Sequence, residues 1–257
     1  KRSNSSTVIS NKGNFTAPLI VAADGRNSRM RFFANIKSFF YDYNQLAYVF
    51  NITHSLSHHS RAIERFFPSG PLALLPMQNN NKKSSSVVWT VDLPFKQKLL
   101  ENKNFYNEFE KKYSEAFGKI IKTSKPVIYN LSVISCYEYF KERIVLIGDA
   151  CQAIHPIAGQ GLNLGLRDSD KLAKIISESL KLGLDIGSTF VLKDYSSKRL
   201  VDKKLLIQAT HRLNQLFSNK SIFIKAIRKN GLKLFNKSSY LKKKSMMFAM
   251  GLMNFDS

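Results

Sequence analysis

The chain has 257 residues, of which 44% are hydrophobic, 12% aromatic and 23% charged, a composition that excludes a disordered tail and indicates a folded globular protein. Its 40 Lys and Arg residues exceed its 18 Asp and Glu residues by 22, so the surface favours anionic partners such as nucleic acid, anionic lipid or an anionic cofactor. Two cysteines, Cys136 and Cys151, without CxxC spacing exclude a disulfide scaffold and a cysteine-ligated metal site and fit a reducing compartment.

The first half of the chain predicts a short strand, an antiparallel sheet and a helix. Residues 17–23 form an apolar run before Asp24-Gly25, which is typical of a buried strand that ends in a tight turn. From residue 44 to about residue 91, short segments rich in Tyr, Phe, Val and Thr alternate with turn residues, which predicts antiparallel strands. Apolar residues recur at spacings of three and four between residues 98 and 122, so we expect an amphipathic helix there, broken near Asn104.

The second half predicts a strand, a glycine-rich turn and several helices. Residues 143–148 include a continuous apolar run, which is typical of a parallel strand covered on both faces. The turn occupies residues 148–161, and a helical period then continues until Gly183, which is suited to end a helix. Residues 188–257 favour two or three amphipathic helices, interrupted at Ser218-Asn219 and near Asn236. No apolar run approaches the roughly 20 residues that a membrane span requires.

The stretch from Gly148 to Asn163 carries the most chemical information. The carboxylate of Asp149 directly follows the predicted strand, where it can accept hydrogen bonds from ribose or ribitol hydroxyls. Glycines at the start of the next helix allow close approach to the backbone, and the helix start offers unpaired N–H groups and positive partial charge. These features suit the electron-rich edge of a nucleotide or flavin. The alternative is an ordinary strand-to-helix turn in which Asp149 is a simple cap.

Two motifs resemble those of the flavoprotein aromatic hydroxylases related to para-hydroxybenzoate hydroxylase. In the second FAD-binding motif of that family, a Gly-Asp pair is followed by His-Pro, Gly-Gln-Gly, Asn and Gly. The corresponding residues here are Gly148, Asp149, His155, Pro156, Gly159, Gln160, Gly161, Asn163 and Gly165. A second motif, Asp-Gly-x-x-Ser-x-x-Arg, is present at residues 24–31 and lies in the family near the flavin pyrophosphate and the path used by NAD(P)H. We expect the two loops, each following an inner strand, to share one crevice.

Within this superfamily the chain is most similar to the ubiquinone-biosynthesis hydroxylases of the octaprenyl-methoxyphenol hydroxylase type. The similarity is carried by residues 62–66, residues 70–76, Gln152 and residues 213–219. The family begins with a βαβ unit that carries Gly-x-Gly-x-x-Gly, and these 257 residues contain no such motif and do not begin with Met. We therefore expect the chain to correspond to the C-terminal two-thirds of such a hydroxylase.

The resemblance implies a mixed α/β fold, with part of a Rossmann-like FAD-binding domain, an inserted antiparallel-sheet substrate domain and a C-terminal helical segment. The expected boundaries place the end of the first FAD-binding part at residues 1–34 and the substrate domain at residues 35–135. The second FAD-binding part follows at residues 136–187, and the helices occupy residues 188–257.

The resemblance also implies the reaction. The complete enzyme would be an FAD-dependent monooxygenase that uses NAD(P)H and O₂ to hydroxylate the phenolic ring of a prenylated ubiquinone precursor, whereas the isolated chain is expected to be inactive. The implied cofactor-binding residues are Asp24, Gly25, Arg31, Gly148, Asp149, Pro156, Gly159, Gln160, Gly161, Leu162 and Asn163. The implied substrate residues are Phe66, Gly70, Pro71, Leu74 and His155. None is expected to be an acid–base catalyst, and another flavoprotein aromatic hydroxylase is an alternative.

The remaining histidines and the charge distribution complete the predictions. His54, His58 and His59 occur in a polar stretch, for which surface exposure is favoured over metal binding. Residues 190–257 contain 15 Lys and Arg against three Asp and Glu, interleaved with apolar residues at helical spacing. Such a basic amphipathic surface can lie on anionic lipid, and a prenylated substrate resides in the bilayer.

We therefore expect a cytoplasmic protein peripheral to the inner membrane, on the matrix side if the source is eukaryotic, with contact to a ubiquinone-biosynthesis complex. The alternatives are a solvated face of ordinary helices and a basic module that binds nucleic acid or membrane without chemistry. Nucleic acid is not an expected partner, because the sequence has no RRM, KH or zinc-finger pattern.

Overall fold

The structure is a computed structural model that describes residues 4–78, 81–96, 105–113, 116–154, 159–218 and 221–250. The chain divides into two compact units. The first, here called the motif unit, comprises residues 1–41, 133–211 and 238–257; the second, the sheet unit, comprises residues 42–132 and 212–237. The sheet unit thus begins at residue 42, where we expected residue 35, and it includes helical residues that we had assigned to a separate C-terminal segment.

A small mixed sheet forms the centre of the motif unit. Strand β11 (Ile144–Leu146) runs parallel to β3 (Ile20–Ala22) and antiparallel to β10 (Phe140–Lys141). All three residues of β11 are buried, as the continuous apolar run predicts. Strand β3 is more exposed than expected, since Val21 retains 43% of its accessible surface; among the described strands, β3 pairs with β11 alone.

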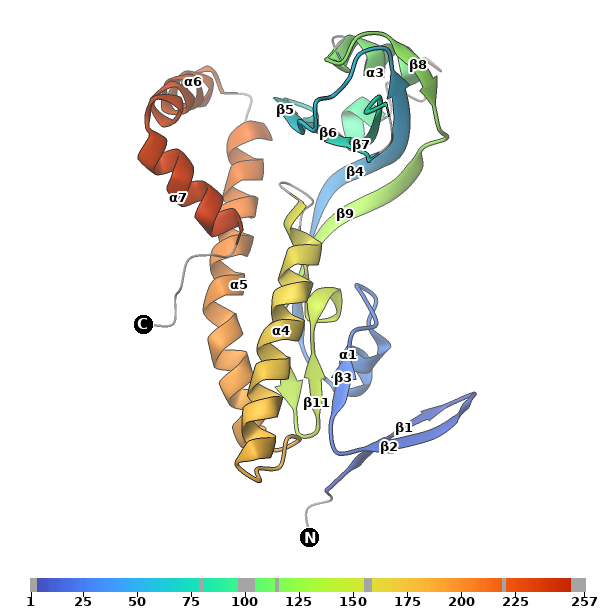
Figure 1. The fold of residues 1–257 in the computed structure, drawn as a ribbon, viewed down its shortest axis with the longest axis vertical. Coiled ribbons are helices and arrows are strands. Elements are labelled where there is room, and N and C mark those ends of the chain that lie inside the picture. The colour runs from blue at the N-terminus through green and yellow to red at the C-terminus, as the bar shows by residue number, and fades with distance from the viewer. Residues whose placement is uncertain are drawn as a thin grey trace. The chain divides into compact units, whose positions relative to one another are not determined.

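Helices complete the core of the motif unit, where α4 (Gln160–Lys181) and the first part of α5 (Thr189–Ser218) run side by side (Figure 1). Leu172 and Ile175 of α4 and Leu192 of α5 are buried with the β11 side chains in one apolar cluster. Gly183, at a φ of +68°, follows the end of α4, and the amide of Leu184 donates to the carbonyl of Ser179. This glycine-terminated helix end confirms the predicted stop.

The other elements of the motif unit are shorter. They are the hairpin β1 (Ser6–Ser10) and β2 (Gly13–Ala17), helix α1 (Arg29–Phe33), the 3₁₀ turn η1 (Gly148–Ala150), strand β12 (Gln152–Ala153) and helix α7 (Ser239–Ala249). Strand β12 pairs antiparallel with the end of β9 (Val127–Cys136). Among the described residues, no helix combines the length and apolar character needed to cross a bilayer.

The sheet unit is built on antiparallel strands, as predicted. Strands β4 (Ser38–His54), β7 (Ser84–Asp92), β6 (Gly70–Pro76) and β5 (Ile63–Phe67) are hydrogen-bonded in that order, and β8 (Ile120–Thr123) also pairs with β4. Alternate side chains fill the core on one face, under helix α3 (Phe105–Tyr113). They are Leu46, Tyr48, Phe50, Ile52, Leu72, Leu74, Val87, Trp89 and Val91. Helix α6 (Ile222–Lys237) belongs to the same unit.

Two predictions for this region are wrong. The helix expected to reach residue 122 ends at Tyr113. Residues 120–123 instead form a strand that pairs with β4, because three of the four are β-branched and favour an extended backbone. Its expected start and break lie outside the described residues. His54 and His58 are buried rather than exposed: the ring of His54 bonds the Leu56 carbonyl at 2.7 Å and the Ser85 hydroxyl at 2.9 Å. His59 is exposed. Within the described residues, no cluster of His, Cys, Asp or Glu is arranged to hold a metal ion.

Candidate functional site

The two motif loops leave the same end of adjacent parallel strands. Ala22, the last residue of β3, pairs in register with Leu146, the last residue of β11, and the amide of Ile147 donates to the Ala22 carbonyl at 3.0 Å. Because the carboxyl ends of parallel strands meet at one sheet edge, the loops that begin at Asp24 and at Gly148 start side by side.

The loop that begins at Asp24 is organised around its carboxylate. Asp24 accepts hydrogen bonds from the Ser28 hydroxyl at 2.5 Å and from the Met30 amide at 3.0 Å. Ser28 in turn caps α1, because its hydroxyl accepts from the amide of Arg31 at 2.9 Å. Partial burial opposes ionisation of Asp24, but these hydrogen bonds outweigh it and hold the pKa of Asp24 below its ordinary value. Gly25 turns the chain at a φ of +82°.

Arg31 joins this loop to the second one. Its guanidinium donates to the carbonyl of Ala150 at 2.8 Å and to the carbonyl of Arg26 at 2.9 Å. Ala150 is the last residue of η1, so one side chain ties the end of the Asp-Gly loop to the Gly-Asp turn. The structure therefore brings Asp24, Gly25, Arg31, Gly148 and Asp149 to a single edge.

The Gly-Asp turn leaves its carboxylate open. Gly148 adopts a left-handed φ of +58°, and its amide donates to the carboxylate of Asp168 at 2.9 Å. Asp149 is exposed and makes no hydrogen bond or ion pair with another described residue. It caps neither η1 nor α4, so the structure does not support the alternative in which Asp149 is a simple cap.

Helix α4 begins beside this turn. A Cβ placed on Gly165 would lie 3.5 Å from the Cα of Gly148, so the helix backbone approaches the turn with no side chain between them. The cap residue Gly159 has a φ of +60° and provides no side-chain acceptor, and a Cβ on Gly159 or Gly161 would meet nothing within 4 Å. The cap residue therefore supplies no side-chain acceptor to the start of the helix, and the space beside Gly159 and Gly161 is open.

The remaining predicted cofactor residues follow in the first turn of α4. The side chain of Gln160 is buried, whereas those of Leu162 and Asn163 are exposed. His155 and Pro156 lie outside the described residues.

Buried cysteines lie directly behind the turn. Cys151 follows Ala150, and its carbonyl accepts from the Cys136 amide at 3.1 Å. Burial raises the pKa of Cys151, and the hydrogen bond between the two thiols lowers the pKa of Cys136. Burial also raises the pKa of Tyr139 and of Tyr195 in the same core. The interior behind the turn is thus rich in polar groups as well as in apolar ones.

The predicted substrate residues of the sheet unit do not share one face. Phe66 and Pro71 are register partners on β5 and β6, and the Phe66 ring stacks on Phe217 at 4.0 Å between centroids. Leu74 is on the opposite, core face and is only 1% exposed. Gly70 serves the close approach of two strands, because its Cβ would lie 2.5 Å from the Thr90 carbonyl oxygen.

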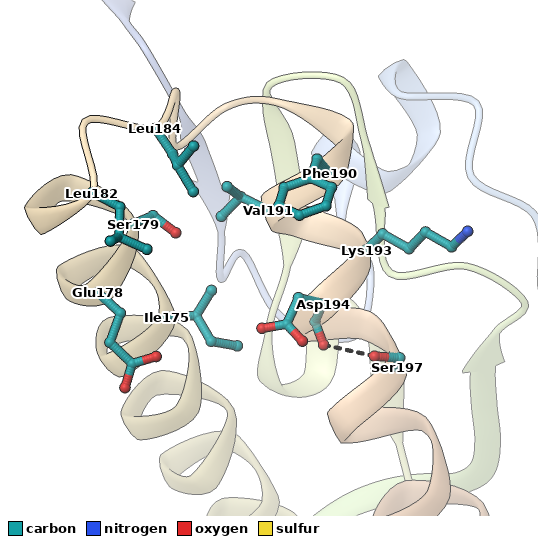
Figure 2. A pocket seen from close by; sticks show the side chains of 10 residues that line it. All are labelled: Ile175, Glu178, Ser179, Leu182, Leu184, Phe190, Val191, Lys193, Asp194 and Ser197. Carbon is teal, nitrogen blue, oxygen red and sulfur yellow. Dashed lines mark hydrogen bonds between the residues drawn. The ribbon is translucent and has the colours of Figure 1, made fainter.

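A cavity of about 520 Å³ opens in the motif unit between the C-terminal part of α4 and the start of α5 (Figure 2). Leu182, Leu184 and Phe190 form its apolar side, and Glu178 and Asp194 add carboxylates. None of the residues predicted for the site lines this cavity, which lies toward the end of α4 opposite Gly159.

No role was assigned to Asp168 in the sequence analysis. Leu164, Asp168, Leu172 and Ile175 recur at helical spacing and are all buried, so a carboxylate occupies the apolar face of α4. An aspartate at a position that the helical spacing assigns to the core is the sequence pattern that could have indicated a role for Asp168.

Comparisons with known proteins identify the family and the fold. Residues 5–210 match a protein family described as "FAD binding domain". "Ubiquinone hydroxylase UbiL" of Rhodospirillum rubrum is 36% identical over 248 residues, which cover 96% of this chain and 57% of that protein. "Ubiquinone biosynthesis monooxygenase COQ6, mitochondrial" of Homo sapiens is 30% identical over 271 residues, which cover 91% of this chain and 57% of that protein.

Among solved structures, p-nitrophenol 4-monooxygenase PnpA from Pseudomonas putida superposes with a TM-score of 0.76 at 17% identity, over 97% of this chain and 65% of that one. The resemblance inferred from the two motifs and the mixed α/β fold are both confirmed. The chain spans somewhat more than half the length of the curated relatives.

Proposed function

Because the chain belongs to the FAD binding domain family, we propose that it forms part of an FAD-dependent monooxygenase that hydroxylates the phenolic ring of a prenylated ubiquinone precursor. The observation that carries this proposal is the joining of both motif loops at one edge of β3 and β11 through Arg31. The names of the two curated relatives support the substrate class.

The groups at this edge match the chemistry of FAD. The open carboxylate of Asp149 is suited to accept hydrogen bonds from ribityl or ribose hydroxyls. The backbone at the start of α4, where the cap residue Gly159 has no side chain, is suited to donate to the carbonyl edge of the flavin pyrimidine. The open space at Gly159 and Gly161 allows a flat ring system to approach the backbone.

When bound, FAD reduced by NAD(P)H would supply, together with O₂, the oxygen atom transferred to the phenol. This chain would bind and orient FAD and stabilise negative charge on it. The positive end of α4 favours negative charge on the neighbouring pyrimidine. The carboxylate of Asp24 and the guanidinium of Arg31 are engaged within the protein, so we assign both to shaping the loops around the cofactor.

For the substrate, we assign Phe66 and Pro71 to the apolar surface that faces the ring, because both lie on the face of the sheet opposite the core. Leu74 and Gly70 would support that surface through core packing and strand spacing. His155 and Pro156 stay predictions, as a substrate contact and a rigid wall beside the flavin.

We also propose that the basic C-terminal region contacts anionic lipid at the inner membrane, where a prenylated substrate and a ubiquinone-biosynthesis complex would be found. Residues 212–244 contain ten Lys and Arg and no Asp or Glu. On α6, Leu232 and Leu234 are exposed beside Lys233, and on α7, Met246 is exposed near Lys243. Exposed apolar groups beside cations suit a headgroup region, with each cation contributing about 1 kcal/mol near the surface.

Vesicle sedimentation tests the lipid contact. The complete protein should pellet with vesicles of phosphatidylcholine containing phosphatidylglycerol, less so in high salt, and less so after replacement of Lys233 and Lys243 with Glu. Equal binding to pure phosphatidylcholine vesicles would argue against an electrostatic contact.

The enzymatic proposal is tested with the complete protein. It should purify yellow, contain FAD, and oxidise NAD(P)H with O₂ in the presence of a prenylated phenol. Asp149→Ala should lose FAD during gel filtration with unchanged circular dichroism, whereas Asp170→Ala, an exposed position on α4, should retain it. A complete protein without flavin, or equal FAD content in Asp149→Ala and the parent, would contradict the proposal.

A further inference from the structure

A buried ion cluster lies behind the Gly-Asp turn. Asp168 of α4 and Lys203 of α5 are both 0% exposed, and Arg199 of α5 is also buried. The carboxylate of Asp168 accepts from Arg199 Nε at 2.8 Å and from Lys203 Nζ at 2.9 Å. Charges so far from water are tolerated only when they are paired and hydrogen-bonded, so the three side chains are mutually dependent.

The same carboxylate reaches the backbone of the motif. Its Oδ2 atom, which accepts from Lys203, also accepts from the amide of Gly148 at 2.9 Å. The two backbone amides before Gly148 have carbonyl acceptors in neighbouring segments: the Leu146 amide donates to the Tyr139 carbonyl and the Ile147 amide to the Ala22 carbonyl. The ladder then ends, and the Gly148 amide has Asp168 as its acceptor.

Lys203 holds the other side of the turn. Its ammonium lies 3.4 Å from Cys151 Sγ and 4.2 Å from the centre of the Tyr139 ring. Gly148 and Cys151 flank Asp149 and Ala150, so the cluster contacts both residues that bracket the exposed carboxylate. With Arg31 on the Ala150 carbonyl, the turn is fixed at its beginning, at its end and at the residue that follows.

We propose that Asp168, supported by Arg199 and Lys203, is a positioning residue that fixes the Gly148–Ala150 turn so that the Asp149 carboxylate meets the hydroxyls of FAD. This inference rests on the proposed function, because it names the residues that act through Asp149. Well-packed apolar side chains stabilise a core at least as well as a buried ion cluster, so stability alone does not account for a carboxylate placed against the Gly148 amide.

The test is a double-mutant cycle on FAD affinity in the complete protein. Asp168→Asn should raise the dissociation constant for FAD, measured by fluorescence titration of the apoprotein, by about tenfold. Asp168→Asn added to Asp149→Ala should raise it no further, because the positioned group is already absent. A purely structural role predicts that the two effects multiply, and this result would overturn the inference.

Two further variants keep the test decisive. Asp170→Asn is the matched control, since Asp170 is exposed on the same helix and pairs with Lys174 at 2.8 Å; its FAD affinity should stay within about twofold of the parent.

If Asp168→Asn does not fold, Lys203→Met takes its place in the cycle, because it removes one partner of Oδ2 and keeps the stem length. Unchanged FAD affinity in a folded variant would overturn the inference. Failure of the parent protein to bind FAD would instead overturn the proposed function.

Discussion

Replacement of Arg31 with Met tests whether one side chain joins the two motif loops. The substitution keeps the apolar stem and removes two charge-assisted hydrogen bonds, at 2.8 Å to Ala150 and 2.9 Å to Arg26. Hydrogen bonds to charged groups contribute about 1.5–3 kcal/mol each, and the partial exposure of Arg31 favours the lower end. For the two bonds together, the expected loss in the free energy of unfolding is therefore about 3 kcal/mol.

Thermal unfolding of the complete protein measures this loss. In a domain of 150–250 residues, about 1 kcal/mol corresponds to about 2–4 °C, so Arg31→Met should lower Tm by about 6–12 °C. Arg29→Met is the matched control, because Arg29 is exposed on the same helix, and it should change the free energy of unfolding by less than about 0.5 kcal/mol. Equal Tm values for the two variants would refute the assignment of Arg31 as the link.

Three further outcomes are expected. Gly70→Ala should destabilise the protein by about 2–4 kcal/mol in urea unfolding, because φ is +130° and the new Cβ would lie 2.5 Å from the Thr90 carbonyl oxygen; an unchanged midpoint would contradict that geometry. Although partial burial opposes it, hydrogen bonding lowers the pKa of Asp24, so its contribution to stability is present above the unfolded value of 3.8 and is lost as pH falls through the lower folded value. Asp24→Asn should therefore show a smaller loss of Tm on acidification than the parent, and parallel curves would contradict this. Cys136 and Cys151 should react with a thiol reagent only after denaturation, and rapid modification of the native protein would contradict their burial.

Local patterns predicted the elements that carry the site. The continuous apolar run before Gly148 forms β11, and the helical period that ends before Gly183 forms α4. Both depend on residues close in sequence: side-chain polarity sets the burial, and a glycine supplies the left-handed conformation that ends the helix. The breaks between α5, α6 and α7 also followed from local composition.

Features that depend on distant partners could not be predicted in this way. The ring of His54 is held inside the protein by the hydroxyl of Ser85, on another strand, and no pattern around residue 54 indicates that partner. Arg31 reaches a carbonyl 119 residues away. Residues 120–123 form a strand because β4 offers them an open edge, although their spacing continues the helical period of the residues before them. The faces of β5 and β6 likewise became clear only once register placed Phe66 opposite Pro71.

The contact between Gly148 and Gly165 limits how the two segments can vary. Each glycine Cα would lie in ordinary van der Waals contact with a methyl group on the other, at 3.7 Å and 3.5 Å, so the gap holds one methyl and not two. An alanine at position 165 is therefore compatible with the present spacing only while position 148 stays without a side chain. The second turn of a long helix and the turn that follows a strand thus leave room for one methyl group between them, so the residue tolerated at either position depends on the residue at the other.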